Sequence, residues 1–256
     1  MDIEELAVLN KIRNEIEIFE LILEMCEEQF DRPKFNRQYR GFRYDNPGMI
    51  EFCTLKAMFA VSNLRAATIL AEAGYAQQVG LLLRVVIDAY TQIEFVLAGY
   101  KDGVLGRAQS KHIKAFFEDY QRGPDIVPKS SKTRQEDIHE VIAKSFLEGN
   151  SVQDSGPHRG KKPTDMLYKI YITFCNYIHG SYPEILDMFG GASPGYFHLS
   201  GMKDTPKDHE SLAQLSCFCD SVALSVRHMV LIFQLKEKVF ENPELAAWWV
   251  KSHNDM

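Results

Sequence analysis

The chain has 256 residues, of which 45% are hydrophobic, with a formal net charge of −6 and an isoelectric point near 5.8. This composition supplies a full hydrophobic core and excludes a disordered chain. The acidic balance argues against a protein that coats nucleic acid or an anionic membrane with its whole surface. The five cysteines lack metal-ligand spacing, so we interpret them as buried thiols and expect no metal and no cofactor.

We expect a cytoplasmic protein without a membrane span. Charged residues interrupt each apolar stretch before it reaches about 18 residues, the length of a membrane-spanning helix. The N-terminal segment is acidic and mixes charges into its apolar positions, unlike a signal or transit peptide.

Apolar residues recur three and four positions apart along almost the whole chain. This spacing predicts an all-α protein, a multi-helix bundle without a real sheet. No repeat or low-complexity linker divides the chain, so we expect a single domain over 1–256. The expected helices are at about 2–30, from after Gly48 to 73, 75–100, 104–120, 131–149, 163–178, 210–239 and 242–252.

The helix expected at 163–178 ends on an Asn-x-x-His-Gly sequence. A helical wheel places His179 on a stripe with Tyr168, Ile172 and Cys175, flanked by Asn176. Because the helix is apolar around most of its circumference, we expect it to be central and His179 to be buried or half-buried. The alternative is that His179 only caps the last carbonyls of the helix.

A second polar stripe lies on the helix expected at 75–100. Arg84 interrupts an apolar run, and Asp88 follows it one turn later. A charged side chain in such a setting is rarely buried unless it is paired. We therefore predict a polar cluster shared between the two helices, with Arg84, Asp88, Asn176 and His179 as candidate catalytic residues. The alternative is an ordinary ion pair within one helix.

The segments "NLRAATILAEAGYAQQVGLLLRVVIDAY" and "YKIYITFCNYIHGSY" resemble an uncharacterised bacterial family of the HEPN (higher eukaryotes and prokaryotes nucleotide-binding) superfamily. The resemblance spans residues 50–182 at most. It implies a HEPN-like helical core with additional N- and C-terminal helices. The matching positions are Leu64, Gly74, Ala76, Leu82, Arg84, Asp88 in place of the usual Glu, Tyr171 and His179.

For active relatives, the resemblance implies metal-independent RNA cleavage by a dimer, in which an Arg and a His four to six residues apart meet from two protomers. No Arg precedes His179 at this spacing. Arg107 with His112 and Arg134 with His139 do match it, but about one such match is expected by chance. We therefore prefer Arg84 and His179 as the catalytic pair.

The segment "RPKFNRQYRGFRY" interleaves basic and aromatic residues, a mixture that grips phosphates and stacks on bases. A second basic segment precedes a helix start, where free backbone N–H groups favour an anion. The alternative is a loop whose aromatic rings dock on the core while the arginines keep it soluble. The predicted nucleic-acid-binding residues are Arg32, Lys34, Arg37, Tyr39, Arg40, Arg43, Arg159, Lys161 and Lys162.

These features predict a protein that acts on or senses RNA or a nucleotide. Metal-independent endoribonuclease activity and a role in stress or phage defence follow from the resemblance alone. The alternative is a non-catalytic helical module that binds a protein partner through the face around Trp248 and Trp249. Apolar stripes on the long first and last helices, together with the habit of the family, predict a homodimer.

Overall fold

The computed structural model describes residues 3–37, 41–121, 138–142, 163–189 and 197–254. The predicted all-α multi-helix architecture is confirmed. Two antiparallel hairpins, each of two very short strands, are additions that the sequence did not predict. The elements are α1 (Ile3–Glu27), β1 (Lys34–Asn36), β2 (Gly41–Arg43), α2 (Met49–Glu72), α3 (Ala76–Ala98), β3 (Tyr100–Lys101), β4 (Val104–Leu105), α4 (Arg107–Gln121), α6 (Pro163–His179), α7 (Tyr182–Asp187), α8 (Pro206–Ile232), α9 (Lys236–Glu241) and α10 (Pro243–Asn254). The predicted helix at 131–149 is described only at 138–142, which is helical.

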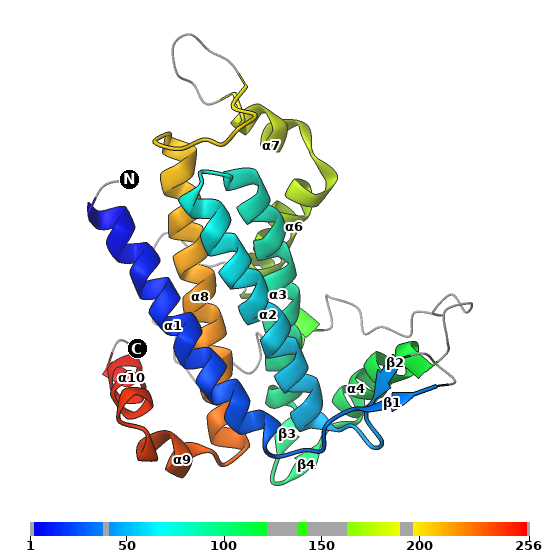
Figure 1. Ribbon diagram of the computed structural model, residues 1–256. Coiled ribbons are helices and arrows are strands. Elements are labelled where there is room, and N and C mark those ends of the chain that lie inside the picture. The colour runs from blue at the N-terminus through cyan, green and yellow to red at the C-terminus, as the bar shows by residue number, and fades with distance from the viewer. Residues whose placement is uncertain (1–2, 38–40, 122–137, 143–162, 190–196, 255–256) are drawn as a thin grey trace.

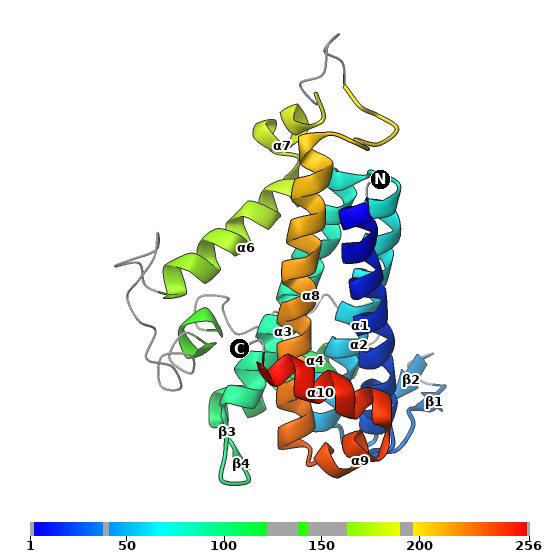
Figure 2. The ribbon, with the colours of Figure 1, turned by 90° about the vertical axis from the view of Figure 1, so that its left-hand side faces the viewer.

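Four long helices, α1, α2, α3 and α8, lie side by side and form the body of the molecule (Figure 1). α2 runs opposite to the other three, and α6 leans away from the body at an angle (Figure 2). The apolar faces of the four helices meet in one continuous core, as in other helical bundles. Its largest fully buried side chains include Phe19, Phe52, Phe95, Leu64 and Ile87.

Local signals explain where several helices begin. Glu51 accepts a hydrogen bond from the backbone N–H of Gly48 at 2.9 Å, which caps the start of α2. The hydroxyl of Thr205 accepts one from the N–H of Asp208 at the start of α8. Asn242 does the same for α10, where Pro243 occupies the first helical position.

The single long helix predicted at 210–239 is wrong, because the chain forms α8 and α9 with a break between them. Gln234 adopts a positive φ of 58°, and the N–H of Leu235 donates to the carbonyl of Val230. The helix thus ends on a residue in the left-handed backbone conformation, a position that glycine usually occupies. A glutamine at this position gives no sequence signal for it.

Trp248 and Trp249 do not form the exposed face that the interaction-module alternative required. They are only 8% and 4% exposed. The Trp248 ring packs edge-on against Phe19 of α1, with 6.3 Å between ring centroids. The two rings thus fasten α10 to the body instead of offering a binding surface.

The apolar stripes on α1 and α8 were one reason to predict a homodimer. In the structure, their residues, including Leu9, Ile12, Ile16, Leu215 and Val222, are buried within the chain's own core. They therefore leave no apolar stripe for a second protomer. A homodimer, if formed, needs another surface.

The interpretation of all five cysteines as buried thiols is correct for three of them. Cys26, Cys53 and Cys219 are buried, whereas Cys175 is partly exposed and Cys217 is exposed. Burial raises the pKa of the Cys26 thiol to about 12, so this thiol stays protonated and unreactive near neutral pH. Cys26 thus acts as a small core side chain.

A partly buried ion pair between α3 and α8 makes the stability of the bundle depend on pH. Glu94 accepts a hydrogen bond from His228 Nδ1 at 2.9 Å. This bond raises the pKa of His228, against the opposing effects of burial and of Arg227. The folded state therefore holds the proton more tightly than the unfolded chain does. The stabilisation is fully present below the unfolded pKa of about 6.5, and it is lost as the pH rises through the raised folded value.

We expect the melting temperature of the wild-type protein to fall as the pH rises above about 6.5. His228→Gln should remove that decline and be less stable than the wild type at low pH. Differential scanning calorimetry between pH 5.5 and 9 checks this expectation. Parallel pH profiles for the two proteins would show that the pair does not contribute.

Candidate functional site

Arg84 lies in the middle of α3, on the side that faces α6, and is only 6% exposed. Its guanidinium forms an ion pair with Asp88 one turn along α3. Its Nε donates a hydrogen bond to Cys175 Sγ on α6 at 3.1 Å. The guanidinium carbon also lies 3.9 Å from the centre of the Tyr171 ring, close enough for a cation–π contact. One buried cation thus joins the two helices, as the matched polar stripes predicted.

The electrostatics of this cluster favour a permanently charged Arg84. Burial acts to lower the pKa of Arg84, but the hydrogen bonds to Cys175 and Asp88 outweigh it, and the pKa is raised. Burial also raises the pKa of the Tyr171 hydroxyl, and the nearby guanidinium opposes the rise. At neutral pH the cluster therefore holds a guanidinium, a carboxylate and a neutral phenol.

His139 belongs to this cluster. It is buried, and its ring centroid lies 5.7 Å from that of Tyr171. Burial lowers the pKa of His139, with Asp88 raising it and Arg84 lowering it further. A neutral imidazole therefore contacts Tyr171 and senses the charges of Asp88 and Arg84. In the sequence, His139 is a candidate because of its spacing from Arg134, which lies outside the described residues. We preferred His179 to it.

His179 does not occupy the predicted place. It is exposed at the last position of α6, and no hydrogen bond, ion pair or ring contact joins it to Arg84 or Asp88 in the described part of the chain. Asn176 is half-buried, and its backbone carbonyl accepts a hydrogen bond from the hydroxyl of Ser181 at 3.3 Å. The expectation of a buried or half-buried His179 is wrong. Tyr177 is buried against Gly80 of α3, and His179, two residues later, faces solvent.

The crossing itself depends on a glycine. A Cβ atom on Gly80 of α3 would lie 2.8 Å from the ring of Tyr177, so only glycine admits this ring of α6. Tyr177 and Phe174 are the buried residues at this contact. The outer residues of α6, including Tyr168 and Ile172, are exposed, so α6 is peripheral. The prediction that this helix is central is therefore wrong.

The other Arg–His pair with the family's spacing is Arg107 and His112, and its histidine belongs to the core. His112 on α4 is buried against the rings of Phe52 and Phe95, each at 5.4 Å. Burial lowers the pKa of His112 to about 4. An imidazole in this position supports packing and lies away from its match, Arg107, which is exposed.

The basic and aromatic segment forms the β1–β2 hairpin. Phe35 and Phe42 face each other across the two strands, with 5.5 Å between ring centroids. They are 58% and 66% exposed. The alternative in which these rings dock on the core is therefore wrong for this pair, although Tyr44 does pack between Phe30 and Phe117.

The basic residues of the hairpin differ in their surroundings. Arg32 and Arg37 are exposed, Lys34 forms an ion pair with Asp45 at 2.5 Å, and Arg43 is half-buried and donates to the carbonyl of Phe42. The remaining predicted nucleic-acid-binding residues lie outside the described residues; they are Tyr39, Arg40, Arg159, Lys161 and Lys162.

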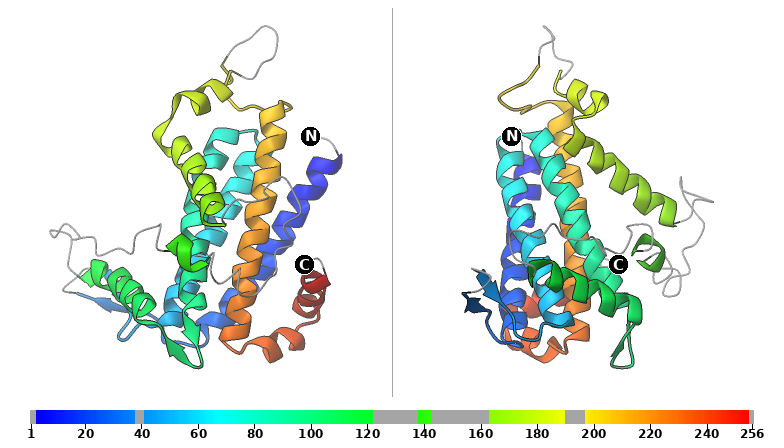
Figure 3. Two further views of the ribbon diagram at one scale, coloured as in Figure 1. Left: turned by 180° about the vertical axis from the view of Figure 1, so that it is seen from behind. Right: turned by 90° about the vertical axis from the view of Figure 1, so that its right-hand side faces the viewer.

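The hairpin and the Arg84 cluster are separate sites. The hairpin projects from one side of the bundle, and α6 lies on the opposite side in the right-hand view of Figure 3. An RNA contact at the hairpin is therefore independent of Arg84 in a single protomer.

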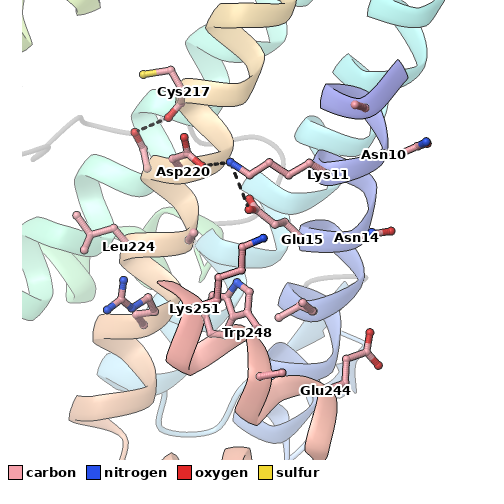
Figure 4. Close-up of a pocket in the computed structure, with 16 residues that line it drawn as sticks. Asn10, Lys11, Asn14, Glu15, Cys217, Asp220, Leu224, Glu244, Trp248 and Lys251 are labelled. Atoms are coloured by element: carbon pink, nitrogen blue, oxygen red, sulfur yellow. Dashed lines mark hydrogen bonds and ion pairs between the residues drawn. The ribbon is translucent and has the colours of Figure 1, made fainter. Parts of the chain in front are cut away.

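A groove of about 1070 Å³ lies between α1, α8 and α10 (Figure 4). Its wall carries Lys11, which bonds to Asp220 at 3.1 Å and lies 3.7 Å from Glu15. Cys219 donates to Glu15 at 3.1 Å from the side of α8. Arg227, Glu244 and Lys251 also line the groove, so its three basic and three acidic side chains balance and give no strong preference for a ligand of either sign.

The described residues contain no group of three or more His, Cys, Asp or Glu side chains arranged to hold a metal ion. α8 is long and apolar enough to cross a membrane by length and composition, but half of the relevant window is buried in the bundle, and core helices of soluble proteins pass the same test. Searches with protein-family models, among curated proteins and among solved structures return no match to this chain.

Proposed function

We propose that this chain is a HEPN-like helical protein that binds single-stranded RNA through the β1–β2 hairpin. The observation that carries the proposal is the exposed cross-strand pair of Phe35 and Phe42, flanked by Arg32 and Arg37. Exposed aromatic rings stack on unpaired bases, and neighbouring arginines bind the phosphates between them. Among soluble proteins, two large rings held together in water are more typical of a binding surface than of a structural turn.

The Tyr44 anchor supports a preformed binding surface. Tyr44 follows β2 and packs between Phe30, three residues after the end of α1, and Phe117 of α4. The base of the hairpin is thus attached to two helices, while its paired rings point into solvent. A surface held in this way loses less conformational entropy when it binds.

Salt dependence tests the charged part of this surface. Each phosphate contact on a single strand contributes about 0.7 to the slope of log affinity against log salt. Replacing both Arg32 and Arg37 with alanine should therefore reduce the slope by about 1.4 for a single-stranded RNA measured by fluorescence anisotropy.

A matched control removes the same number of charges elsewhere. Arg13 and Arg65 form exposed ion pairs with Glu72 and Glu20, on α1 and α2. Alanine at these two positions should leave the slope unchanged. An equal reduction in both double variants would mean that only net charge matters, and the hairpin would lose its role.

Cleavage of RNA at the Arg84 cluster, a site separate from the hairpin, is a second proposal, favoured by the neutral His139 that contacts Tyr171 of this cluster. A neutral imidazole can accept a proton from a ribose 2′-OH, and a guanidinium can stabilise the phosphate charge. The 2′-oxygen then bonds to phosphorus, the bond from phosphorus to the 5′-oxygen breaks, and the 5′-oxygen leaves with a proton from water. Cleavage should then survive EDTA and leave 2′,3′-cyclic phosphate ends. His139→Ala should abolish it and His179→Ala should not. If His179→Ala abolishes cleavage and His139→Ala does not, His179 is the catalytic residue. If the wild type does not cleave RNA, only the proposal of RNA binding remains.

A further inference from the structure

α7 lies at one end of the molecule (Figure 1). Large apolar side chains of α7 and of the residues beside it in the sequence are exposed. Tyr182 is 75% exposed and Leu199 is 80% exposed. We call this set the apical patch; it consists of Ile178, Tyr182, Ile185, Leu186, Phe189, Phe197 and Leu199.

The patch follows the periodicity of a helix that lacks a partner. Tyr182, Ile185 and Leu186 occupy positions i, i+3 and i+4 of α7, the spacing of a helix face that packs against another element, and Phe189 follows two residues after the helix ends. In the described part of the chain, all four remain exposed. The apolar side chains of this segment therefore form a surface that stays exposed to solvent in a single protomer.

The patch is held firmly on its inner side. Asp187 of α7 forms an ion pair with Lys207 of α8 at 2.8 Å, and the N–H of His198 donates to the carbonyl of Met188 at 2.8 Å. The rings of Phe189 and Phe197 contact each other edge-on, with 5.4 Å between centroids. These bonds fix the orientation of α7 and turn its apolar face away from the body.

The size of the patch matches a protein–protein interface. Aromatic side chains carry about 150–250 Å² of surface each, and leucine and isoleucine carry less. The seven side chains, each exposed by two-fifths or more, therefore leave on the order of 600 Å² of apolar surface in water. Stable interfaces bury about 800 Å² on each partner. The largest apolar patch of a typical monomer is about 300–600 Å².

The charges beside the patch point to its occupant. Lys207 is paired with Asp187 and Glu210, and Lys203 is paired with the buried Asp208. The lysines are thus neutralised within the chain, whereas an anionic membrane or a nucleic acid requires uncompensated positive charge. A two-fold contact places identical side chains together, and an apolar patch with paired charges tolerates this without repulsion.

We propose that a second copy of this chain covers the apical patch, with α7 packed against α7 of the partner in a two-fold homodimer. This interface is independent of the hairpin, so RNA binding can fail while the dimer persists, and the reverse also holds.

Sedimentation of the full chain tests this interface. The wild type should be a dimer at tens of micromolar, and the double variant Tyr182→Glu with Leu186→Glu should be a folded monomer. The matched control is Leu231→Glu with Phe240→Glu, since both side chains are similarly exposed, on α8 and α9, and lie outside the patch. The control should remain a dimer.

A monomeric wild type at 100 micromolar, or an apical variant that remains dimeric, would overturn the proposal. So would a monomer that binds vesicles of phosphatidylcholine and phosphatidylglycerol through the patch, because the occupant would then be a membrane. Hydrogen exchange of the wild type needs no variant. On dilution from 100 to 1 micromolar, the segment 182–189 should lose protection while α9 does not, and unchanged protection of 182–189 would count against the dimer.

Discussion

Arg84→Ala is expected to lower the free energy of unfolding by about 2–5 kcal/mol. The change removes charge-assisted hydrogen bonds, worth about 1.5–3 kcal/mol, and a cation–π contact of about 0.5–2 kcal/mol. It also leaves Asp88, Cys175 and the ring of Tyr171 without the cation that joins them. For a chain of this length, each kcal/mol shifts the melting temperature by roughly 2–4 °C.

Arg65→Ala is the control for this variant. Arg65 contacts Glu20 on a neighbouring helix at 2.6 Å, but both side chains are exposed. Exposed pairs of this kind contribute about 0–1 kcal/mol. Chemical denaturation of the two variants compares a buried arginine with an exposed one. Equal losses would show that Arg84 does not fasten α6 to the bundle.

Gly74→Ala should destabilise the protein by about 2–4 kcal/mol, for two separable reasons. Gly74 has a φ of +79°, a conformation that costs an alanine about 1–2 kcal/mol. A Cβ atom there would also lie 2.6 Å from the backbone nitrogen of Lys203. The loop before α8 approaches so closely because the N–H of Met202 donates to the carbonyl of Gly74 at 2.6 Å.

Gly103→Ala separates the two costs. Gly103 has a similar φ of +82°, but no atom lies within 4 Å of an added Cβ. Its substitution should therefore cost only the conformational part, about 1–2 kcal/mol. Thermal unfolding of both variants gives the cost of the loop contact as the difference. If Gly103→Ala is as damaging as Gly74→Ala, the loop adjusts to the side chain without penalty.

The boundaries of α2 and α3 could be predicted because local chemistry decides them. The Asn46-Pro47-Gly48 turn and the left-handed Gly74 bracket α2, and the apolar spacing within each helix is regular. The four-residue spacing likewise predicted the Arg84–Asp88 pair correctly.

The composition of the Arg84 cluster could be predicted only in part, because it depends on how α6 crosses α3. The close approach at Gly80 and Tyr177 sets that crossing and brings Tyr171 and Cys175 to Arg84. It leaves His179 beyond the contact. His139 arrives from a separate segment, and its spacing from Arg134 is common by chance, so no local signal identified it.

The hairpin and the tryptophan pair were missed for different reasons. Strands of three residues are too short to show a period of two, so β1 and β2 read as a loop. The apolar face of α10 is visible in the sequence, but the sequence does not say whether it faces solvent or Phe19. Tertiary packing decided both outcomes.

The most direct test of RNA binding at the hairpin compares three proteins in one titration with a fluorescent single-stranded RNA. Stacking on one base contributes about 1–3 kcal/mol, and 1.4 kcal/mol corresponds to tenfold in affinity. The double variant Phe35→Ala with Phe42→Ala should therefore bind at least about tenfold more weakly than the wild type. Phe59→Ala, which removes a similarly exposed ring from α2, should bind as the wild type does. Equal affinity of all three proteins, or no binding by the wild type at low salt, would contradict the proposed function.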